Sequence, residues 1–80
     1  MLTAYIQAVM GKAHYEILPD DQSFYGAIPG FDGVYANVVG LEACRNELEE
    51  VLQEWILFRV SKNLDLPVVD GLELAIREVV

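Results

Sequence analysis

The middle of the chain holds two short extended runs, a chain reversal between them, and then a long helical pattern. Residues 29–33, Pro-Gly-Phe-Asp-Gly, separate the extended run at residues 23–28 from the run at residues 34–39. Proline has no backbone N–H and glycine tolerates a positive φ, so this segment ends the first run and turns the chain back. We therefore predict two strands joined by this turn.

From Gly40 onward the apolar residues follow helical spacing. Gly40 can act as the N-cap, and Glu42 in the first turn complements the helix dipole. The apolar residues that recur at steps of three and four are Leu41, Cys44, Leu48, Val51, Leu52, Trp55 and Phe58. This stripe predicts a long amphipathic helix that covers one face of the sheet.

The N-terminal third predicts a short helix and a further strand. Residues 3–10 show helical spacing, with Thr3 as a candidate N-cap and Gly11 as the residue after the helix. Residues 13–18 alternate with period two and end at a Pro-Asp-Asp turn. They predict a first strand that forms an antiparallel hairpin with residues 23–28.

The C-terminal end predicts one more element. Pro67 and Gly71 prevent the long helix from continuing, and residues 72–80 alternate again, which predicts a fourth strand with a helix as the alternative. The expected class is α+β: a short helix, a three-stranded antiparallel sheet, a long helix on one face, and the fourth strand. A chain of 80 residues suffices for a single domain over residues 1–80.

Charge and composition narrow the range of partners. The chain carries 5 basic and 13 acidic residues, a formal net charge of −8. This surplus repels phosphate backbones and attracts basic partners, so we expect no direct nucleic-acid binding. There is no 18-residue apolar stretch and no basic leader at the N-terminus, so we expect a cytoplasmic protein without a membrane anchor.

No residue set predicts a catalytic, cofactor or metal site. One cysteine and one histidine cannot form a Cys/His zinc site within one chain. Asp20 and Asp21 lie in one predicted turn and Asp32 in the next, at opposite ends of an up-down-up sheet, so we expect them to hold turns. His14 and Glu16 share a strand face, and Cys44 occupies an apolar helical position; we expect neither set to be catalytic.

The apolar stripe of the long helix is wider than a small sheet needs. Trp55 is expected in the core or at a subunit interface, and Ile56, Leu57 and Val60 broaden the stripe near the helix end. The second body they contact is either the N-terminal helix or another subunit. We predict a homo-oligomer, most simply a dimer, in which these four residues contribute to the interface.

The segment from Phe24 to Trp55 resembles the HicB-like antitoxin family, a group of small proteins. The residues at matching motif positions are Tyr25, Ile28, Pro29, Phe31, Gly33 and Leu41. Val34 replaces the family's cysteine, Val38 its glycine, and Gly40 its Ser/Thr N-cap. The resemblance covers about residues 13–62 and implies a partial ribonuclease H-like sheet.

The resemblance also implies a function. HicB-like antitoxins neutralise HicA, a small basic toxin that cleaves RNA, and an acidic chain suits such a partner. We expect an antitoxin-like module that is not an enzyme, with Asp20, Asp21 and Tyr25 as candidate toxin-facing residues. One alternative is an oligomeric scaffold without a toxin. A less favoured alternative is a ribonuclease H-like hydrolase. Its two-metal reaction needs several carboxylates on the strands, and the predicted strands carry only Glu16 and Glu73.

Overall fold

The computed structural model describes residues 2–72, which contain two helices and three strands in the order α1-β1-β2-β3-α2. The elements are α1 (Leu2–Met10), β1 (His14–Ile17), β2 (Phe24–Ala27), β3 (Tyr35–Val38) and α2 (Leu41–Ser61). The predicted α+β class is confirmed. The predicted fourth strand lies outside the described residues except for Leu72, which forms an isolated antiparallel bridge with Val69.

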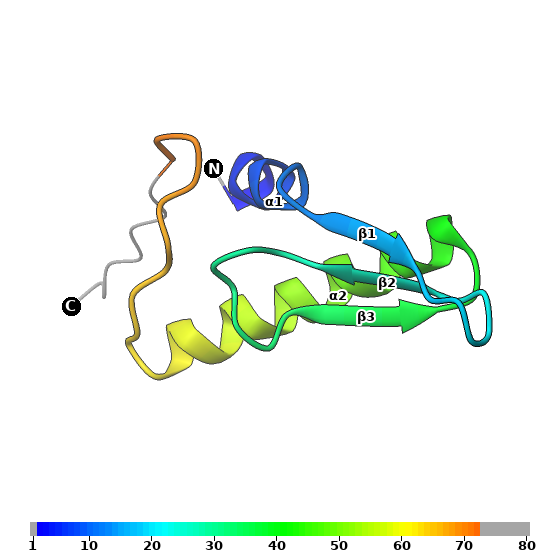
Figure 1. Cartoon of the computed structure of the whole chain (residues 1–80). Helices are drawn as coiled ribbons and strands as arrows, with labels where there is room; N and C mark the ends of the chain where they lie inside the picture. Colours follow the sequence, from blue (N-terminus) through cyan, green and yellow to red (C-terminus); the bar gives the residue numbers. More distant parts are fainter. Residues whose placement is uncertain (1, 73–80) are drawn as a thin grey trace.

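The three strands form one antiparallel sheet in the order β1-β2-β3. Tyr15 lies opposite Gly26, and Gly26 lies opposite Ala36. In the neighbouring row, Tyr25 lies between Glu16 and Asn37. Side chains of successive residues point to opposite faces of a sheet, so these two rows belong to different faces. The β1–β2 and β2–β3 turns lie at opposite ends of the sheet, as predicted (Figure 1).

Helix α2 covers the face that carries the Tyr15-Gly26-Ala36 row (Figure 1). Its buried residues follow a strict four-residue step: Cys44, Leu48, Leu52 and Ile56. The buried stripe is therefore narrower than predicted, because Leu41 and Phe58 are exposed. Ile56, assigned from the sequence to the broadened stripe, instead packs in the core of the chain itself and is only 3% exposed.

Helix α1 packs beyond the start of β1, against the C-terminal half of α2 and the segment that follows it (Figure 1). Tyr5 and Val9 are fully buried, and the Tyr5 hydroxyl donates a hydrogen bond to the Pro67 carbonyl oxygen at 2.5 Å. The helix begins by Leu2, so the expectation that Thr3 caps it was wrong. Within residues 2–72, neither helix combines the length and apolar character needed to cross a bilayer.

The turn before β3 takes the backbone conformation that its glycines predict. Gly30 and Gly33 have φ values of 83° and 90°, in the left-handed region that favours glycine. The Phe31 N–H donates to the Ile28 carbonyl, and the Val34 N–H donates to the Phe31 carbonyl, so two consecutive tight turns reverse the chain. Gly40, with φ 96°, is the N-cap of α2 as predicted and provides no side-chain cap.

Candidate functional site

The β1–β2 turn presents the acidic residues singled out from the sequence. Asp21 Oδ1 accepts hydrogen bonds from the Ser23 hydroxyl at 2.7 Å and from the Ser23 backbone N–H at 3.0 Å. Asn37 Nδ2 donates to the Ser23 hydroxyl oxygen at 2.8 Å, which ties the turn to β3. The expectation that an aspartate holds this turn is confirmed for Asp21. Asp20 is exposed, and within residues 2–72 its carboxylate has no hydrogen-bond partner.

The same hydrogen bonds set the protonation state of Asp21. The bond from the Ser23 hydroxyl, and then that from the Ser23 N–H, hold the pKa of Asp21 below its ordinary value because both stabilise the charged form. Asp32 lies in the β2–β3 turn, at the far end of the sheet (Figure 1). Within residues 2–72 no three His, Cys, Asp or Glu side chains are grouped so that they could hold a metal ion.

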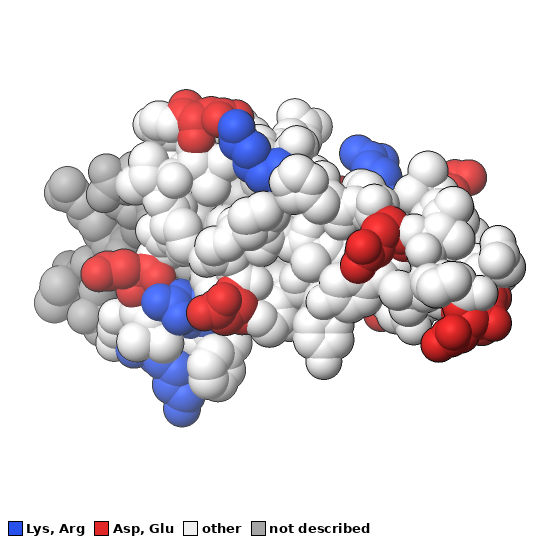
Figure 2. Space-filling view, in the orientation of Figure 1, with Lys and Arg blue, Asp and Glu red and all other residues white. Residues whose placement is uncertain are grey.

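The sheet face opposite α2 has no element packed over it among the described residues. It carries His14, Glu16, Tyr25, Tyr35 and Asn37, and the rings of Tyr25 and Tyr35 stack at 6.1 Å with an interplanar angle of 21°. We call this set the open face. Figure 2 shows that charged side chains are sparse over the sheet and gather mainly toward its margins. His14 and Glu16 are exposed here and lie opposite Ala27 and Tyr25.

The covered face is closely packed around one glycine. A Cβ atom at Gly26 would lie 2.9 Å from the Tyr15 ring and 3.3 Å from Cys44 Sγ, so only glycine fits without movement. Cys44 is fully buried, and its thiol lies 3.5 Å from the Phe24 carbonyl oxygen. Burial raises the pKa of Tyr15, whose hydroxyl has no hydrogen-bond partner among residues 2–72. Cys44 therefore packs between α2 and the sheet as part of the core.

Trp55 fastens the β2–β3 turn to α2. Its indole N–H donates to the Asp32 carbonyl oxygen at 3.0 Å, and its ring packs against Phe31 with centroids 5.0 Å apart. The Arg59 guanidinium lies 4.9 Å from the Trp55 ring centroid, and Arg59 Nε donates to the Asp65 carbonyl oxygen at 2.8 Å. Sequence reasoning missed Arg59, whose only signal was its position one helical turn after Trp55.

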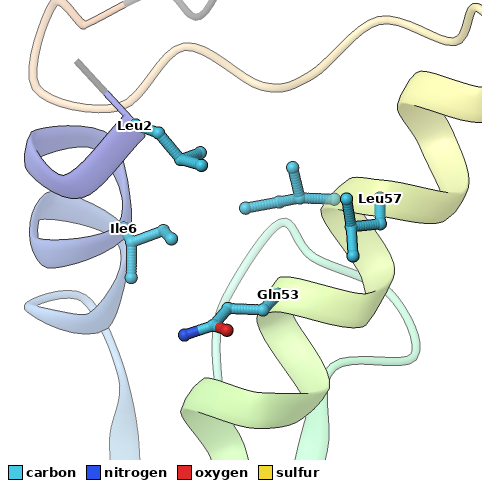
Figure 3. Close-up of a pocket in the computed structure, with 5 residues that line it drawn as sticks. Leu2, Ile6, Gln53 and Leu57 are labelled. Carbon is cyan, nitrogen blue, oxygen red and sulfur yellow. The ribbon is translucent and has the colours of Figure 1, made fainter.

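The four residues predicted at a subunit interface differ in exposure. Leu57 is 68% exposed, whereas Trp55 and Val60 are half-buried and Ile56 is buried. Side chains from α1 and α2 face one another across a small apolar cleft of about 120 Å³ (Figure 3). The cleft is lined by Leu2, Ile6, Gln53, Ile56 and Leu57. The N-terminal helix is thus one body that the broad stripe contacts, and a contact with another subunit stays a prediction.

The negative charge is largely uncompensated at the surface. Glu47, Glu50 and Glu54 are exposed along α2. Within residues 2–72 the sole ion pair joins Lys12 Nζ to Asp70 Oδ1 at 2.9 Å. A surface of this kind attracts a cationic partner and accelerates its association. The features available to such a partner are the acidic β1–β2 turn, the open face and the acidic side of α2.

Comparison with known proteins shows similarity to a family model and to solved structures. A family model described as UPF0150-like matches residues 4–67. The crystal structure of TTHA0281 from Thermus thermophilus superposes with a TM-score of 0.89 at 31% sequence identity. That alignment covers 96% of this chain and 95% of the other, so the similarity extends over the whole fold. No curated protein matches the chain.

Proposed function

Because the chain belongs to the UPF0150-like family, we propose that it is an antitoxin-like binding module. In this proposal it neutralises a small, basic, RNA-cleaving toxin of the HicA type by protein–protein contact. The resemblance of residues 13–62 to HicB-like antitoxins supports the proposal and lies within the range of the family match.

The observation that carries the proposal is the uncompensated acidic surface. The net charge is −8, and within residues 2–72 one ion pair neutralises a single acidic side chain. Exposed carboxylates therefore remain on the β1–β2 turn and along α2. A basic toxin would be drawn to this surface, and the long-range part of the attraction would be screened over about 8 Å at physiological ionic strength.

The proposed contact includes Asp20, Asp21 and Tyr25. Asp20 and Asp21 project from the end of the sheet, and Tyr25 lies on the adjoining open face. An acidic rim beside aromatic side chains suits a partner that carries both lysine or arginine and apolar groups. In this proposal the chain acts by covering its partner, performs no catalytic step and makes no direct contact with nucleic acid.

The proposal also includes self-association, most simply as a dimer. Leu57 and Phe58 are 68% and 58% exposed near the end of α2, and they offer apolar area that a second copy would cover. The alternative function, an oligomeric scaffold with no toxin, shares this property. Toxin binding is therefore the measurement that separates the two.

The direct test is co-purification with a basic HicA-type toxin, followed by an RNA cleavage assay. We expect a stable complex, loss of cleavage at saturating antitoxin, and no cleavage by this chain alone. Association should slow as salt rises, because exposed charges are screened. Unimpeded cleavage at saturating antitoxin would refute the proposal for that toxin, whereas an oligomer that binds no toxin would favour the scaffold.

Two charge-matched variants locate the contact. Asp20→Lys and Glu50→Lys change the net charge equally, but one lies in the β1–β2 turn and the other on α2. If the turn faces the toxin, Asp20→Lys should slow association more than Glu50→Lys, because contact charges act at shorter range. Equal effects would exclude the turn as the contact and leave neutralisation itself in place.

A further inference from the structure

The outer strands of the sheet, β1 and β3, form its two edges. The order β1-β2-β3 leaves the outer side of β1 and of β3 without a paired strand among residues 2–72. No main-chain hydrogen bond from another part of that range reaches β3 on its outer side. Unpaired N–H and C=O groups along such an edge form a template for another extended strand.

The two edges differ in the side chains that protect them. β1 exposes the ionisable residues His14 and Glu16, and Lys12 lies two residues before its start. Charged residues on an edge strand discourage pairing with other chains. From residue 34 to residue 39, by contrast, no residue is charged, and Tyr35 and Val39 are 55% and 77% exposed. The β3 edge thus lacks the protection that β1 has.

We propose that β3 is a self-association edge, where β3 of a second copy of this chain pairs with it antiparallel about a two-fold axis at Asn37. The two sheets then form one continuous sheet with three strands from each copy. This inference does not depend on the proposed toxin partner. It also concerns a surface separate from the exposed end of α2.

Two observations favour a second copy over a basic partner at this edge. The edge carries no charge, so it offers no electrostatic complementarity to a cationic protein, and it allows two chains of net charge −8 to meet at an uncharged surface. In addition, the edge carries two exposed apolar side chains, Tyr35 and Val39, that could cover one another in a two-fold pair. An isologous two-fold contact requires that a residue i faces a residue j while j faces i.

Every two-fold antiparallel register meets this requirement, and the register centred on Asn37 is distinguished by the side chains that it brings together. It places Tyr35 opposite Val39 of the second copy, and Val39 opposite Tyr35. Opposed residues in an antiparallel pair share a face, and residues 35 and 37 share one within β3 because side chains alternate. Val39 directly follows the last residue of β3, so in this proposal the pairing extends the strand by one residue and brings Val39 onto the same face. The two most exposed apolar side chains of this edge would cover one another. A shift by one residue would place each of them opposite a residue of the wrong face.

The test measures molar mass by light scattering at tens of micromolar protein. Both Tyr35 and Val39 are exposed, so Tyr35→Lys and Val39→Glu should fold, which circular dichroism checks. We expect each single change to halve the molar mass, because it puts a charge in an apolar contact. The double variant brings opposite charges together across the axis and should restore the wild-type mass.

Two further variants serve as controls. Tyr25→Lys adds a charge to the same face on the central strand and should keep the wild-type mass. Leu57→Glu tests the separate contact proposed at the end of α2, and any change in mass that it causes should add to that of the β3 variants. A monomeric wild type, or single edge variants that keep the wild-type mass, would overturn the proposal. Dissociation that the double variant fails to reverse would overturn the register centred on Asn37.

Discussion

The two faces of the sheet are ordered by different forces. On the covered face, Gly26 lies beneath the Tyr15 ring and beside Cys44, and the buried residues of α2 complete a closely packed layer. On the open face, Tyr25 and Tyr35 stack in contact with solvent, and Asn37 is held by hydrogen bonds to Ser23 and to the Phe24 carbonyl. Packing holds the first face, whereas stacking and hydrogen bonds hold the second.

This difference separates stability from recognition within one thin sheet. A small chain buries a limited fraction of its surface, so most of its hydrophobic stabilisation must come from the single covered face. The open face contributes less to stability and can vary to suit a partner. The cost of a substitution should therefore depend on the face it alters, and matched pairs of variants measure that dependence.

The largest effect should come from Leu48→Ala. Leu48 is fully buried on the side of α2 that faces the sheet. Removing its side chain loses apolar transfer energy and leaves a cavity, at a cost of about 2–5 kcal/mol. Leu41→Ala makes the same chemical change on the same helix at an exposed position, where a change within about 0.5 kcal/mol is expected. Urea denaturation measures both. Equal losses would contradict the assignment of the core.

An intermediate effect should come from Gly26→Ala. The added methyl group would lie 2.9 Å from the Tyr15 ring, and overpacking of this kind costs about 1–3 kcal/mol. Alanine also restricts the unfolded chain more than glycine does, which stabilises the fold by about 0.4–1 kcal/mol. Because this gain is smaller than the cost of overpacking, we expect a net loss of stability. The control, Ala27→Val, adds atoms at the next residue on the open face and should be nearly neutral. A stabilised Gly26→Ala protein would disprove the close contact.

The smallest effect should come from Asp21→Asn, and it should depend on pH. The pKa of Asp21 is lower in the folded chain than its ordinary value of 3.8, because its carboxylate accepts the hydrogen bonds from Ser23. Its carboxylate therefore stabilises the fold fully above that pH, and the contribution disappears as the pH falls through the folded pKa. Wild type should exceed Asp21→Asn in melting temperature at pH 7, and the gap should close in acid below about pH 4.

Asp20→Asn is the control for this measurement. It removes a carboxylate from the same turn, but one without the hydrogen bonds to Ser23. It should leave the melting temperature close to that of wild type across the same pH range. An acid-dependent gap of similar size for Asp20→Asn would show that overall charge, and not the Asp21–Ser23 contact, produces the effect.

The sequence predicted the elements well because local rules govern them. The extended runs predicted at residues 13–18, 23–28 and 34–39 placed the three strands to within about a residue. The Pro-Gly-Phe-Asp-Gly turn and Gly40 adopted the expected backbone. The opposite placement of the Asp20 and Asp32 turns followed from strand order alone (Figure 1). Residue type and spacing are sufficient where hydrogen bonds and φ preferences act between near neighbours.

Helix periodicity predicted the existence of α2 but not the width of its buried stripe. Leu41 and Phe58 fit the apolar spacing yet remain exposed, whereas Ile56 lies in the core. Helical spacing identifies an apolar side, but the elements packed against it decide which residues are buried. Here the narrow sheet buries only every fourth residue of α2, from Cys44 onward. Helix α1 packs against the C-terminal half of α2, near Ile56.

The sequence by itself determined the class of the fold, the positions of the turns and the acidic charge, because propensity, periodicity and composition are properties of residues and their neighbours. Tertiary structure alone decided that Tyr15 requires glycine at position 26 and that Trp55 joins the β2–β3 turn to α2 beneath the Arg59 guanidinium. It also decided that β3 is an edge strand with no further strand paired to it within residues 2–72. Each of these depends on contacts between residues distant in the chain, whose distances no local pattern records.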